Sequence, residues 1–316
     1  MASDKINGKF KGKDILSLNQ FSIQDLQQVF RLAKKIKSSR EYSPKLRGKL
    51  ATLLFYEPSS RTFGSFAAAI KHLGGNTLDI LDPKTFSSVS KGETLEDTVR
   101  VFETYTDAIV IRHPEKGAAQ KAADAASIPV INAGDGVGEH PTQALLDLFT
   151  IYENCGKLDN LTGVIAGDIL NGRTVHSLIK GLAKFKKNTL YLLSPESLKL
   201  TREEYTEFSK DTKIIEINAE KDLPKNADFW YWTRVQKERF QSLDDYDKVK
   251  HQFIVTKKLM ETYAGKKTIL MHPLPRVGEI LEEIDSDPRA LYLKTQVKNG
   301  MFVRMALLIL ILGKSK

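Results

Sequence analysis

The sequence contains one cysteine, Cys155, among its 316 residues. A single cysteine excludes a disulfide within the chain and is typical of proteins that fold in a reducing compartment. The segment Met1–Lys5 begins neither an apolar signal region nor a transit segment rich in arginine and serine. We therefore expect a cytoplasmic protein. Because Cys155 lies at the end of a predicted helix, it is a poor candidate for a nucleophile.

Long hydrophobic runs are also missing. The longest run, Met305–Leu312, is far shorter than the roughly 20 residues that cross a membrane. Arg304 and Gly313 flank this run. We expect it to form a buried C-terminal helix, and we expect no association with a membrane.

Patterns that bind metals are missing as well. The chain has 6 histidines, and none of them is spaced as His-x-x-x-His or combined with several cysteines. The sequence therefore predicts no metal site, and nothing in it requires a cofactor.

The chain is basic, but its charge is dispersed. Lysine and arginine number 48 against 39 acidic residues, which gives a formal net charge of +9. The basic residues form short clusters at 9–13, 34–37 and 184–187, without the interleaved aromatic residues that stack on bases. This pattern argues against nucleic-acid binding and indicates a surface that mildly attracts small anions.

Short apolar segments alternate with helical segments along the chain, which is long enough for two domains. This alternation is typical of α/β folds with parallel sheets. The predicted strands are 50–55, 76–81, 108–111, 128–132, 164–166, 189–193, 213–218, 229–232 and 268–271. A first helix is predicted to begin at a capping box formed by Ser22 and Asp25. Another helix is predicted to begin at Pro141, and the remaining predicted helices are 65–73, 94–105, 117–126, 201–209 and 294–312. We predict a loop at 82–92.

The stretch 55–66 connects a predicted strand to an alanine-rich predicted helix. A proline ends the strand, so the hydroxyls of Ser59, Ser60 and Thr62 and the guanidinium of Arg61 fall at the first helical turn. Free backbone N–H groups and the positive end of the helix dipole face outward at such a turn. Together these groups indicate a phosphate-binding site. The alternative is an ordinary helix cap with a solvated arginine.

Other polar groups also follow predicted strands. Arg112 comes directly after the strand 108–111, at the carboxyl end where ligands gather in open α/β sheets. It is therefore placed to bind an anion or to polarise a carbonyl group. His140 and Gln143 stand at the start of a helix with a spacing that points them to the same side. A histidine before a helix is otherwise usually a polar cap.

Two glycine-containing turns raise the possibility of a nucleotide site. Gly134–Gly138 has the spacing G-x-G-x-G rather than the G-x-G-x-x-G of dinucleotide sites, and the expected acidic residue is missing. Gly167–Thr174 approaches a phosphate-binding P-loop, but Arg173 replaces the lysine and bulky residues separate the glycines. A P-loop NTPase is the alternative here, and protection by ATP against heat unfolding would reveal it.

These motifs resemble those of one family. The run Phe55–Thr62 resembles the first signature of the aspartate and ornithine carbamoyltransferases, and His140–Gln143 resembles the second. The family usually has threonine or glycine where this chain has Ser60, and often arginine where it has Phe63. Ser60 keeps a hydroxyl and a backbone N–H, so this departure changes little. The resemblance extends over nearly all of the chain.

The resemblance implies a site for carbamoyl phosphate. Its phosphate would bind at the turn before the first signature helix, and a loop from the neighbouring subunit would bring Ser87 and Lys91 into the site. The residues expected to bind carbamoyl phosphate are Ser59, Ser60, Arg61, Thr62, Ser87, Lys91, Arg112, His140, Gln143, Leu274 and Pro275. Those expected to be catalytic are Arg61, Thr62, Lys91, Arg112 and His140.

The resemblance also implies that the second substrate is aspartate. The segment Thr233–Arg239 is similar to the aspartate-binding loop of the family, and Pro273 stands where ornithine enzymes carry cysteine. Without the resemblance, such a dense cluster of charges after a strand is more often the solvated start of a helix. The residues expected to bind aspartate are Lys91, Arg173, Arg234 and Gln236.

The implied fold has two doubly wound parallel-sheet domains joined by helices. A carbamoyl-phosphate-binding domain would comprise residues 1–143 and 294–316, with the C-terminal helix returning to it, and an aspartate-binding domain would comprise 144–293. The active sites would be shared between the subunits of a homotrimer. Further domains of the pyrimidine pathway or regulatory chains are compatible partners.

The implied reaction transfers the carbamoyl group of carbamoyl phosphate to the α-amine of L-aspartate, in de novo pyrimidine (UMP) biosynthesis. It would need neither a cofactor nor a covalent intermediate. The alternatives are an ornithine-type transcarbamoylase and a catalytically inactive relative that only binds anions.

Overall fold

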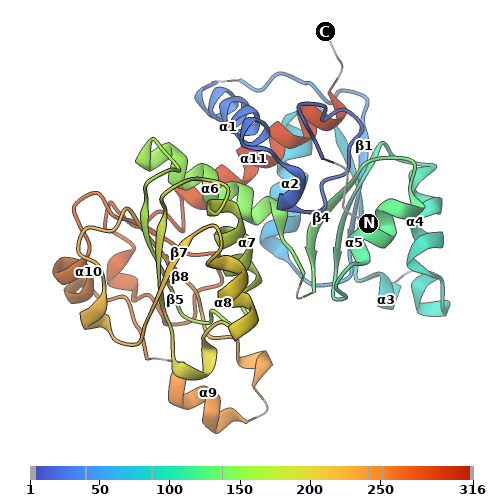
Figure 1. Cartoon of the computed structure of the whole chain (residues 1–316). Helices are drawn as coiled ribbons and strands as arrows, with labels where there is room; N and C mark the ends of the chain where they lie inside the picture. Colours follow the sequence, from blue (N-terminus) through green and yellow to red (C-terminus); the bar gives the residue numbers. More distant parts are fainter. Residues whose placement is uncertain are drawn as a thin grey trace. The chain divides into compact units, whose positions relative to one another are not determined.

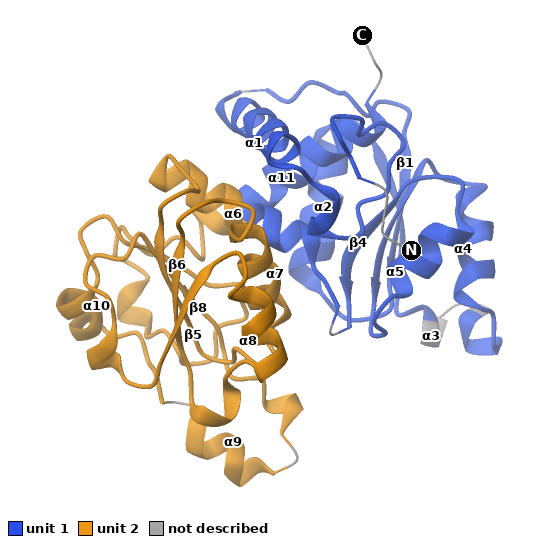
Figure 2. Ribbon diagram, in the orientation of Figure 1, with its two compact units in different colours: residues 1–146, 298–316 blue, residues 147–297 orange. Residues whose placement is uncertain are grey.

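The computed structural model describes residues 5–39, 41–86, 88–136, 138–240, 242–250 and 252–313. The chain forms two compact units, coloured separately in Figure 2. Unit 1 comprises Met1–Leu146 and Lys298–Lys316, and unit 2 comprises Asp147–Val297. The divisions between the units fall inside two helices, α6 (Pro141–Cys155) and α11 (Thr295–Leu312).

Unit 1 is built on a parallel sheet with the strand order β2-β1-β3-β4. Strands β1 and β4 of this sheet are labelled in Figure 1. Its strands are β1 (Leu50–Phe55), β2 (Asn76–Leu81), β3 (Ala108–His113) and β4 (Val130–Asp135). Its helices are α1 (Ile23–Ser38), α2 (Ser60–His72), α3 (Pro83–Phe86), α4 (Leu95–Glu103) and α5 (Ala118–Ala125), with 3-10 turns η1 (Leu18–Gln20) and η2 (Ser88–Lys91). Figure 2 shows α2 on one side of this sheet and α4 and α5 on the other.

Unit 2 contains a second parallel sheet with the strand order β7-β6-β5-β8-β9. Its strands are β5 (Thr162–Ala166), β6 (Thr189–Leu193), β7 (Lys213–Ile217), β8 (Phe229–Trp232) and β9 (Ile269–Met271). Its helices are α7 (Arg173–Leu182), α8 (Arg202–Phe208), α9 (Leu243–Val249) and α10 (Lys257–Tyr263), and its 3-10 turns are η3 (Glu196–Leu198), η4 (Glu220–Asp222), η5 (Lys237–Arg239) and η6 (Glu282–Ile284). In Figure 2, α7 and α8 lie on one side of the sheet and α10 on the other.

Both strand orders place a topological switch point next to the first strand of the unit. In unit 1 the chain runs from β1 to one side and then returns to continue from β3 on the other. In unit 2 the same reversal lies between β5 and β8. Open α/β sheets bind ligands beyond the carboxyl ends of the strands at such points. We therefore expect ligand-binding residues in the turns after β1, β3, β5 and β8.

The predicted α/β architecture is confirmed, and several elements follow from local signals. Strand β1 is apolar and buried from Ala51 onward, as expected for a parallel strand covered on both faces. Helix α1 begins at a capping box, in which the Asp25 N–H donates to Ser22 Oγ over 3.2 Å and the Ser22 N–H donates to Asp25 Oδ2 over 2.8 Å. One face of the helix is buried through its apolar residues Leu26, Val29, Phe30, Ala33 and Ile36.

Some predicted boundaries are wrong. Strand β3 was predicted to end at residue 111, before the charged Arg112, but it continues to His113. His113 pairs with Asp135 of the neighbouring strand. Strand β4 begins only at Val130, after a proline that cannot donate to the sheet, and it includes Gly134, which was predicted to be in a turn. The predicted loop at 82–92 contains the short helices α3 and η2.

The C-terminal helix α11 is long and apolar enough to span a membrane by length and composition alone, but 67% of it is buried inside the fold. Phe302, Met305 and Leu308 are almost wholly inaccessible to solvent. The prediction of a buried C-terminal helix is therefore confirmed.

Candidate active site

The first candidate anion site is the start of helix α2 in unit 1. The first helical hydrogen bond runs from the Phe63 N–H to the Ser59 carbonyl over 3.0 Å, and the side chain of the N-cap residue Ser59 makes no capping hydrogen bond. The N–H groups of Ser60, Arg61 and Thr62 therefore lie in the first turn of the helix, where its dipole is positive. Thr62 is buried, whereas Ser60 and Arg61 are exposed. This turn has the donors and the positive charge that a phosphate requires.

Arg112 stands beside this turn because of the strand register. It pairs with Phe55, the last residue of β1, and its Nη1 donates to the Ala133 carbonyl over 3.2 Å. Its Nη2 lies 3.3 Å from Oε2 of Glu57, just upstream of α2. The side chain is only 12% exposed. These contacts hold the guanidinium at the carboxyl ends of β1, β3 and β4.

His140 directly precedes helix α6 and Gln143 lies in its first turn, as predicted. The His140 carbonyl accepts from the N–H of Gln143 over 3.0 Å, and the imidazole side chain is buried. Asp135 braces the preceding turn by accepting from the Glu139 N–H over 2.9 Å. A Cβ on Gly138 would lie 2.5 Å from Asp135 Oδ1, so this close approach requires glycine. The glycine turn therefore positions His140.

Arg304 connects the two helix starts of unit 1, a role that the sequence analysis missed. Its Nη1 donates to Ser65 Oγ on α2 over 3.0 Å, and its Nη2 donates to Thr142 Oγ1 on α6 over 3.3 Å. The guanidinium also lies 5.0 Å from the ring centre of Phe66. The sequence did contain a signal for this role, because Arg304 directly precedes the longest apolar run. An arginine that is buried with such a run needs polar partners, here the hydroxyls of Ser65 and Thr142.

The predicted partner loop is only partly covered by the structure. Ser87 lies outside the described residues. Lys91 ends the turn η2, and its side chain is exposed. Its assignment to the site of a neighbouring subunit stays a prediction.

In unit 2, the turns after β5 and β8 begin side by side. Ala166 pairs with Trp232, and the Thr233 N–H donates to the Ala166 carbonyl over 2.8 Å. Gly167 adopts φ +110°, and a Cβ there would lie 2.1 Å from the Thr233 carbonyl oxygen. Only glycine permits this approach.

Asp168 joins these two turns, and the sequence analysis did not select it. Its fully buried carboxylate accepts from the Asn171 N–H over 3.0 Å and from the Gln236 N–H over 3.3 Å. The Gln236 side chain donates in turn to the Asn171 carbonyl over 2.9 Å. Burial raises the pKa of Asp168, against the opposing effect of these hydrogen bonds. Arg173 follows as the first residue of α7.

These contacts also bear on the P-loop alternative. A P-loop binds phosphate through free backbone N–H groups. In this loop the Asn171 N–H is bound by Asp168, and the Arg173 N–H donates to the Asn171 carbonyl over 3.0 Å. The loop is closed on itself and on the turn after β8, so its geometry argues against a nucleotide site.

Arg234 already binds a carboxylate in a bidentate arrangement. Its Nη1 donates to Glu238 Oε2 over 3.0 Å, and its Nη2 donates to the second oxygen. The hydrogen bond with Glu238 raises the pKa of Arg234 and lowers that of Glu238. The fork of this guanidinium can thus hold a carboxylate in a bidentate arrangement, and in this structure Glu238 occupies it.

Leu274 and Pro275 follow β9, which is the neighbour of β8 in the sheet. The peptide bond between them is cis, and the Leu274 N–H donates to His272 Nδ1 over 2.7 Å. Unit 2 thus has five of the predicted residues after the carboxyl ends of its strands, namely Arg173, Arg234, Gln236, Leu274 and Pro275.

Other chemistry is not supported by the described residues. Within them, no group of three or more His, Cys, Asp or Glu side chains is gathered as a metal site would need. Burial raises the pKa of Cys155 to about 11, so this thiol is protonated at neutral pH and a poor nucleophile.

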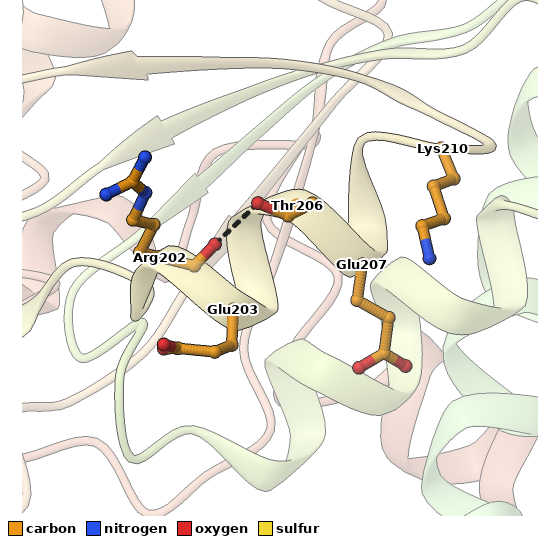
Figure 3. Close-up of a pocket in the computed structure, with 5 residues that line it drawn as sticks. All are labelled: Arg202, Glu203, Thr206, Glu207 and Lys210. Carbon is orange, nitrogen blue, oxygen red and sulfur yellow. Dashed lines mark hydrogen bonds between the residues drawn. The ribbon is translucent and has the colours of Figure 1, made fainter.

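A cavity of about 560 Å³ lies on α8 (Figure 3). It is lined by exposed residues of both charge signs, Arg202, Glu203, Thr206, Glu207 and Lys210. None of them is a predicted site residue, and the cavity lacks the convergent donors found at the strand ends. We therefore place the chemistry in the strand-end turns rather than here.

Comparison with known proteins agrees with this geometry. Residues 13–153 match the sequence profile of the aspartate/ornithine carbamoyltransferase carbamoyl-P binding domain. Residues 159–311 match that of the aspartate/ornithine carbamoyltransferase Asp/Orn binding domain. The two matches together cover most of the chain.

Similar full-length proteins are known from several organisms. A chloroplastic aspartate carbamoyltransferase of Arabidopsis thaliana is 48% identical over 96% of this chain and 79% of its own length. An aspartate carbamoyltransferase catalytic subunit of Clostridium kluyveri is 46% identical over 96% of this chain and 99% of its own.

Among solved structures, aspartate transcarbamoylase from Trypanosoma cruzi in complex with carbamoyl aspartate and phosphate superimposes with a TM-score of 0.89 and 38% identity. The match covers 99% of this chain and 100% of that one. With both domain profiles matched and the fold shared, this chain belongs to the aspartate/ornithine carbamoyltransferase family.

Proposed function

We propose that this chain is an aspartate carbamoyltransferase of pyrimidine biosynthesis. It transfers the carbamoyl group of carbamoyl phosphate to the α-amine of L-aspartate, giving N-carbamoyl-L-aspartate and phosphate. The observation that carries the choice of acceptor is the pair of arginines, Arg173 and Arg234, at adjacent strand-end turns of unit 2. Two guanidinium groups match the two carboxylates of aspartate, whereas they would repel the side-chain ammonium of ornithine.

The phosphate of carbamoyl phosphate binds to unit 1 in this proposal. The start of α2 holds its phosphate through Ser59, Ser60, Arg61 and Thr62, because backbone N–H groups, hydroxyls and a guanidinium meet there. Arg112, His140 and Thr62 donate to the carbonyl oxygen, which becomes negative in the tetrahedral transition state. The carbamoyl amine is bound by Gln143 and by the carbonyls of Leu274 and Pro275.

Aspartate binds to unit 2. Arg173 and Arg234 pair with its carboxylates, Gln236 completes the pocket, and Lys91 of a neighbouring subunit adds a positive charge. Asp168 holds Gln236 against the loop that leads to Arg173, so it positions this set without contacting the substrate.

The reaction is a single acyl transfer. The lone pair of the aspartate amine attacks the carbonyl carbon, a C–N bond forms, and the C–O bond to the phosphate breaks. The amine proton passes to the departing phosphate, which is the nearest base that the substrates themselves supply. The protein contributes orientation and preorganised charge, which account for large parts of enzymatic rate enhancement.

The direct test is product formation from carbamoyl phosphate with L-aspartate and with L-ornithine, measured side by side. We expect carbamoyl-aspartate and no citrulline. Product from ornithine alone would mean that the acceptor site in unit 2 is misassigned while the phosphate site stands. No product from either acceptor would favour the inactive anion-binding relative.

We also propose a homotrimer in which Lys91 completes the site of a neighbouring subunit. Light scattering should then give three times the 35.5 kDa mass of one chain. Lys91→Ala and Arg61→Ala should each be nearly inactive alone, yet regain activity when mixed under conditions of subunit exchange. One subunit of each hybrid then has an intact site. Hybrids that form, as seen by ion exchange, but stay inactive would contradict shared sites.

A further inference from the structure

His272 is a buried histidine that the proposed mechanism does not use. It directly follows β9, and its side chain is 1% exposed. Its Nδ1 lies 2.7 Å from the Leu274 N–H donor, and its Nε2 lies 2.6 Å from Oε1 of Glu279. Both ring nitrogens are therefore bound.

These contacts select one protonation state of the imidazole. A backbone N–H can only donate, so Nδ1 must offer its lone pair to Leu274. The ring proton then sits on Nε2 and is donated to Glu279. The second Glu279 oxygen accepts from the Val277 N–H over 3.0 Å, which ties the carboxylate to the same loop. Rotation of the ring would break both of its hydrogen bonds.

A buried network holds the backbone of His272 in place. Its N–H donates to Gln296 Oε1 over 2.9 Å, and the Gln296 amide donates to Asp147 Oδ1 over 2.7 Å. The second Asp147 oxygen accepts from the Tyr231 hydroxyl over 2.9 Å. His272 is thereby anchored to β8 within unit 2.

The backbone of Leu274 needs such an anchor. Its φ of +58° lies in the left-handed region, which a branched side chain rarely adopts. Conformations of this kind persist where the surroundings fix them, and they gather at functional sites. The hydrogen bond to His272 Nδ1 fixes this residue from its N–H side.

We propose that His272 is a positioning residue, whose Nδ1 sets the place of the Leu274–Pro275 carbonyls. This inference rests on the proposed function, in which those carbonyls accept from the carbamoyl amine. The imidazole does not touch the substrate. The imidazole acts by fixing the positions of the carbonyl oxygens of Leu274 and Pro275.

The electrostatic surroundings agree with a neutral ring. Burial lowers the pKa of His272, and nearby Arg276 and Arg234 lower it further, against the opposing effect of Glu279. Burial acts to raise the pKa of Glu279, but its hydrogen bonds from His272 and Val277 outweigh this and lower it. At neutral pH, Glu279 is therefore the acceptor of the Nε2 proton and Nδ1 stays free to accept.

Two substitutions of His272 separate its two hydrogen bonds. In His272→Asn the amide oxygen lies where Nδ1 was, so the acceptor for Leu274 is kept and the donor to Glu279 is lost. In His272→Gln the amide nitrogen reaches the position of Nε2, so the donor is kept and the acceptor is lost. Each variant keeps one of the two bonds, so we expect comparable losses of thermal stability.

The kinetic expectation differs between them. We expect kcat of His272→Gln to be roughly 10- to 100-fold below that of His272→Asn, because small displacements of groups that orient the substrate have effects of this size. A purely structural histidine would make the two variants equally active, or would order them by stability, and either result would overturn the proposal. The exposed His72→Gln should behave like the wild-type protein.

One further measurement keeps the test decisive if the variants do not fold. In wild-type protein with ¹⁵N-labelled histidine, His272 should give the signals of a neutral ring protonated at Nε2. Buried His113 should give the same tautomer, because its Nδ1 accepts from the Glu115 N–H over 3.1 Å, so the His272 signal has to be assigned individually. An assigned His272 ring that carries its proton on Nδ1 would overturn the proposal. Absence of carbamoyl-aspartate formation by the wild-type enzyme would instead refute the proposed function, so the two failures are distinguishable.

Discussion

Replacing Arg61 by alanine should lower kcat/KM for carbamoyl phosphate by at least about 10³-fold. Loss of one donor to a transition-state oxyanion typically has an effect of about 10²–10³. Arg61 does more, because its guanidinium neutralises part of a dianion at the start of α2. Steady-state kinetics with saturating aspartate measure this loss, and turnover at saturating carbamoyl phosphate shows how much of it is in kcat.

The control for this variant is Arg31→Ala. Arg31 is also an exposed arginine of unit 1, but it lies on α1, outside the proposed site. Its loss should leave kcat/KM unchanged, and both variants should melt near the wild-type temperature because neither side chain is buried. Near-normal activity of Arg61→Ala would remove the phosphate site from α2.

Replacing Asp168 by alanine should have the second largest effect. The change removes a fully buried carboxylate, which is the acceptor of the N–H groups of the half-buried Asn171 and Gln236. Buried donors without partners cost about 1–3 kcal/mol each, so we expect unfolding at distinctly lower temperature or denaturant concentration. The turns that carry Arg173 and Gln236 also lose their connection, and kcat/KM for aspartate should fall about 10²-fold.

Two comparisons make this prediction specific. Direct binding of carbamoyl phosphate should be nearly unchanged in Asp168→Ala, because the phosphate site belongs to unit 1. Asp168→Asn keeps one oxygen that can accept from Asn171 but presents an amide to the Gln236 N–H, so its kinetics should be intermediate. Equal weakening of both substrates would show that Asp168 supports the fold as a whole rather than the aspartate turns.

The sequence predicted the parts of this molecule that depend on neighbouring residues. The strand 50–55 is an apolar run, and Ser22 and Asp25 form a capping box by local geometry. The turn before α2 was predictable for the same reason, since a proline and clustered hydroxyls mark it, but the helix begins at Ser60 rather than at the predicted residue 65. The short helices α9 and α10 were missed, although their caps Ser242 and Thr256 gave a local signal.

The parts that could not be predicted are partnerships between distant residues. Asp168 meets Gln236, Arg304 meets Ser65 and His272 meets Glu279 only after the sheets have formed. A buried polar group needs a partner, but the sequence does not say which one. The predicted end of β3 was wrong for a similar reason. A charged residue such as Arg112 indicates the end of a strand, but pairing with the neighbouring strand extends β3 beyond it.

The buried Arg304 has a consequence for how unit 1 responds to its ligand. Its guanidinium fastens the second turn of α2 to the first turn of α6, so we expect the two helix ends that are proposed to bind carbamoyl phosphate to behave as one stiff body. Little conformational freedom is then left to be lost when the ligand arrives. Amide hydrogen exchange in α2 should therefore be slow already in the free protein, and carbamoyl phosphate should slow it only slightly further.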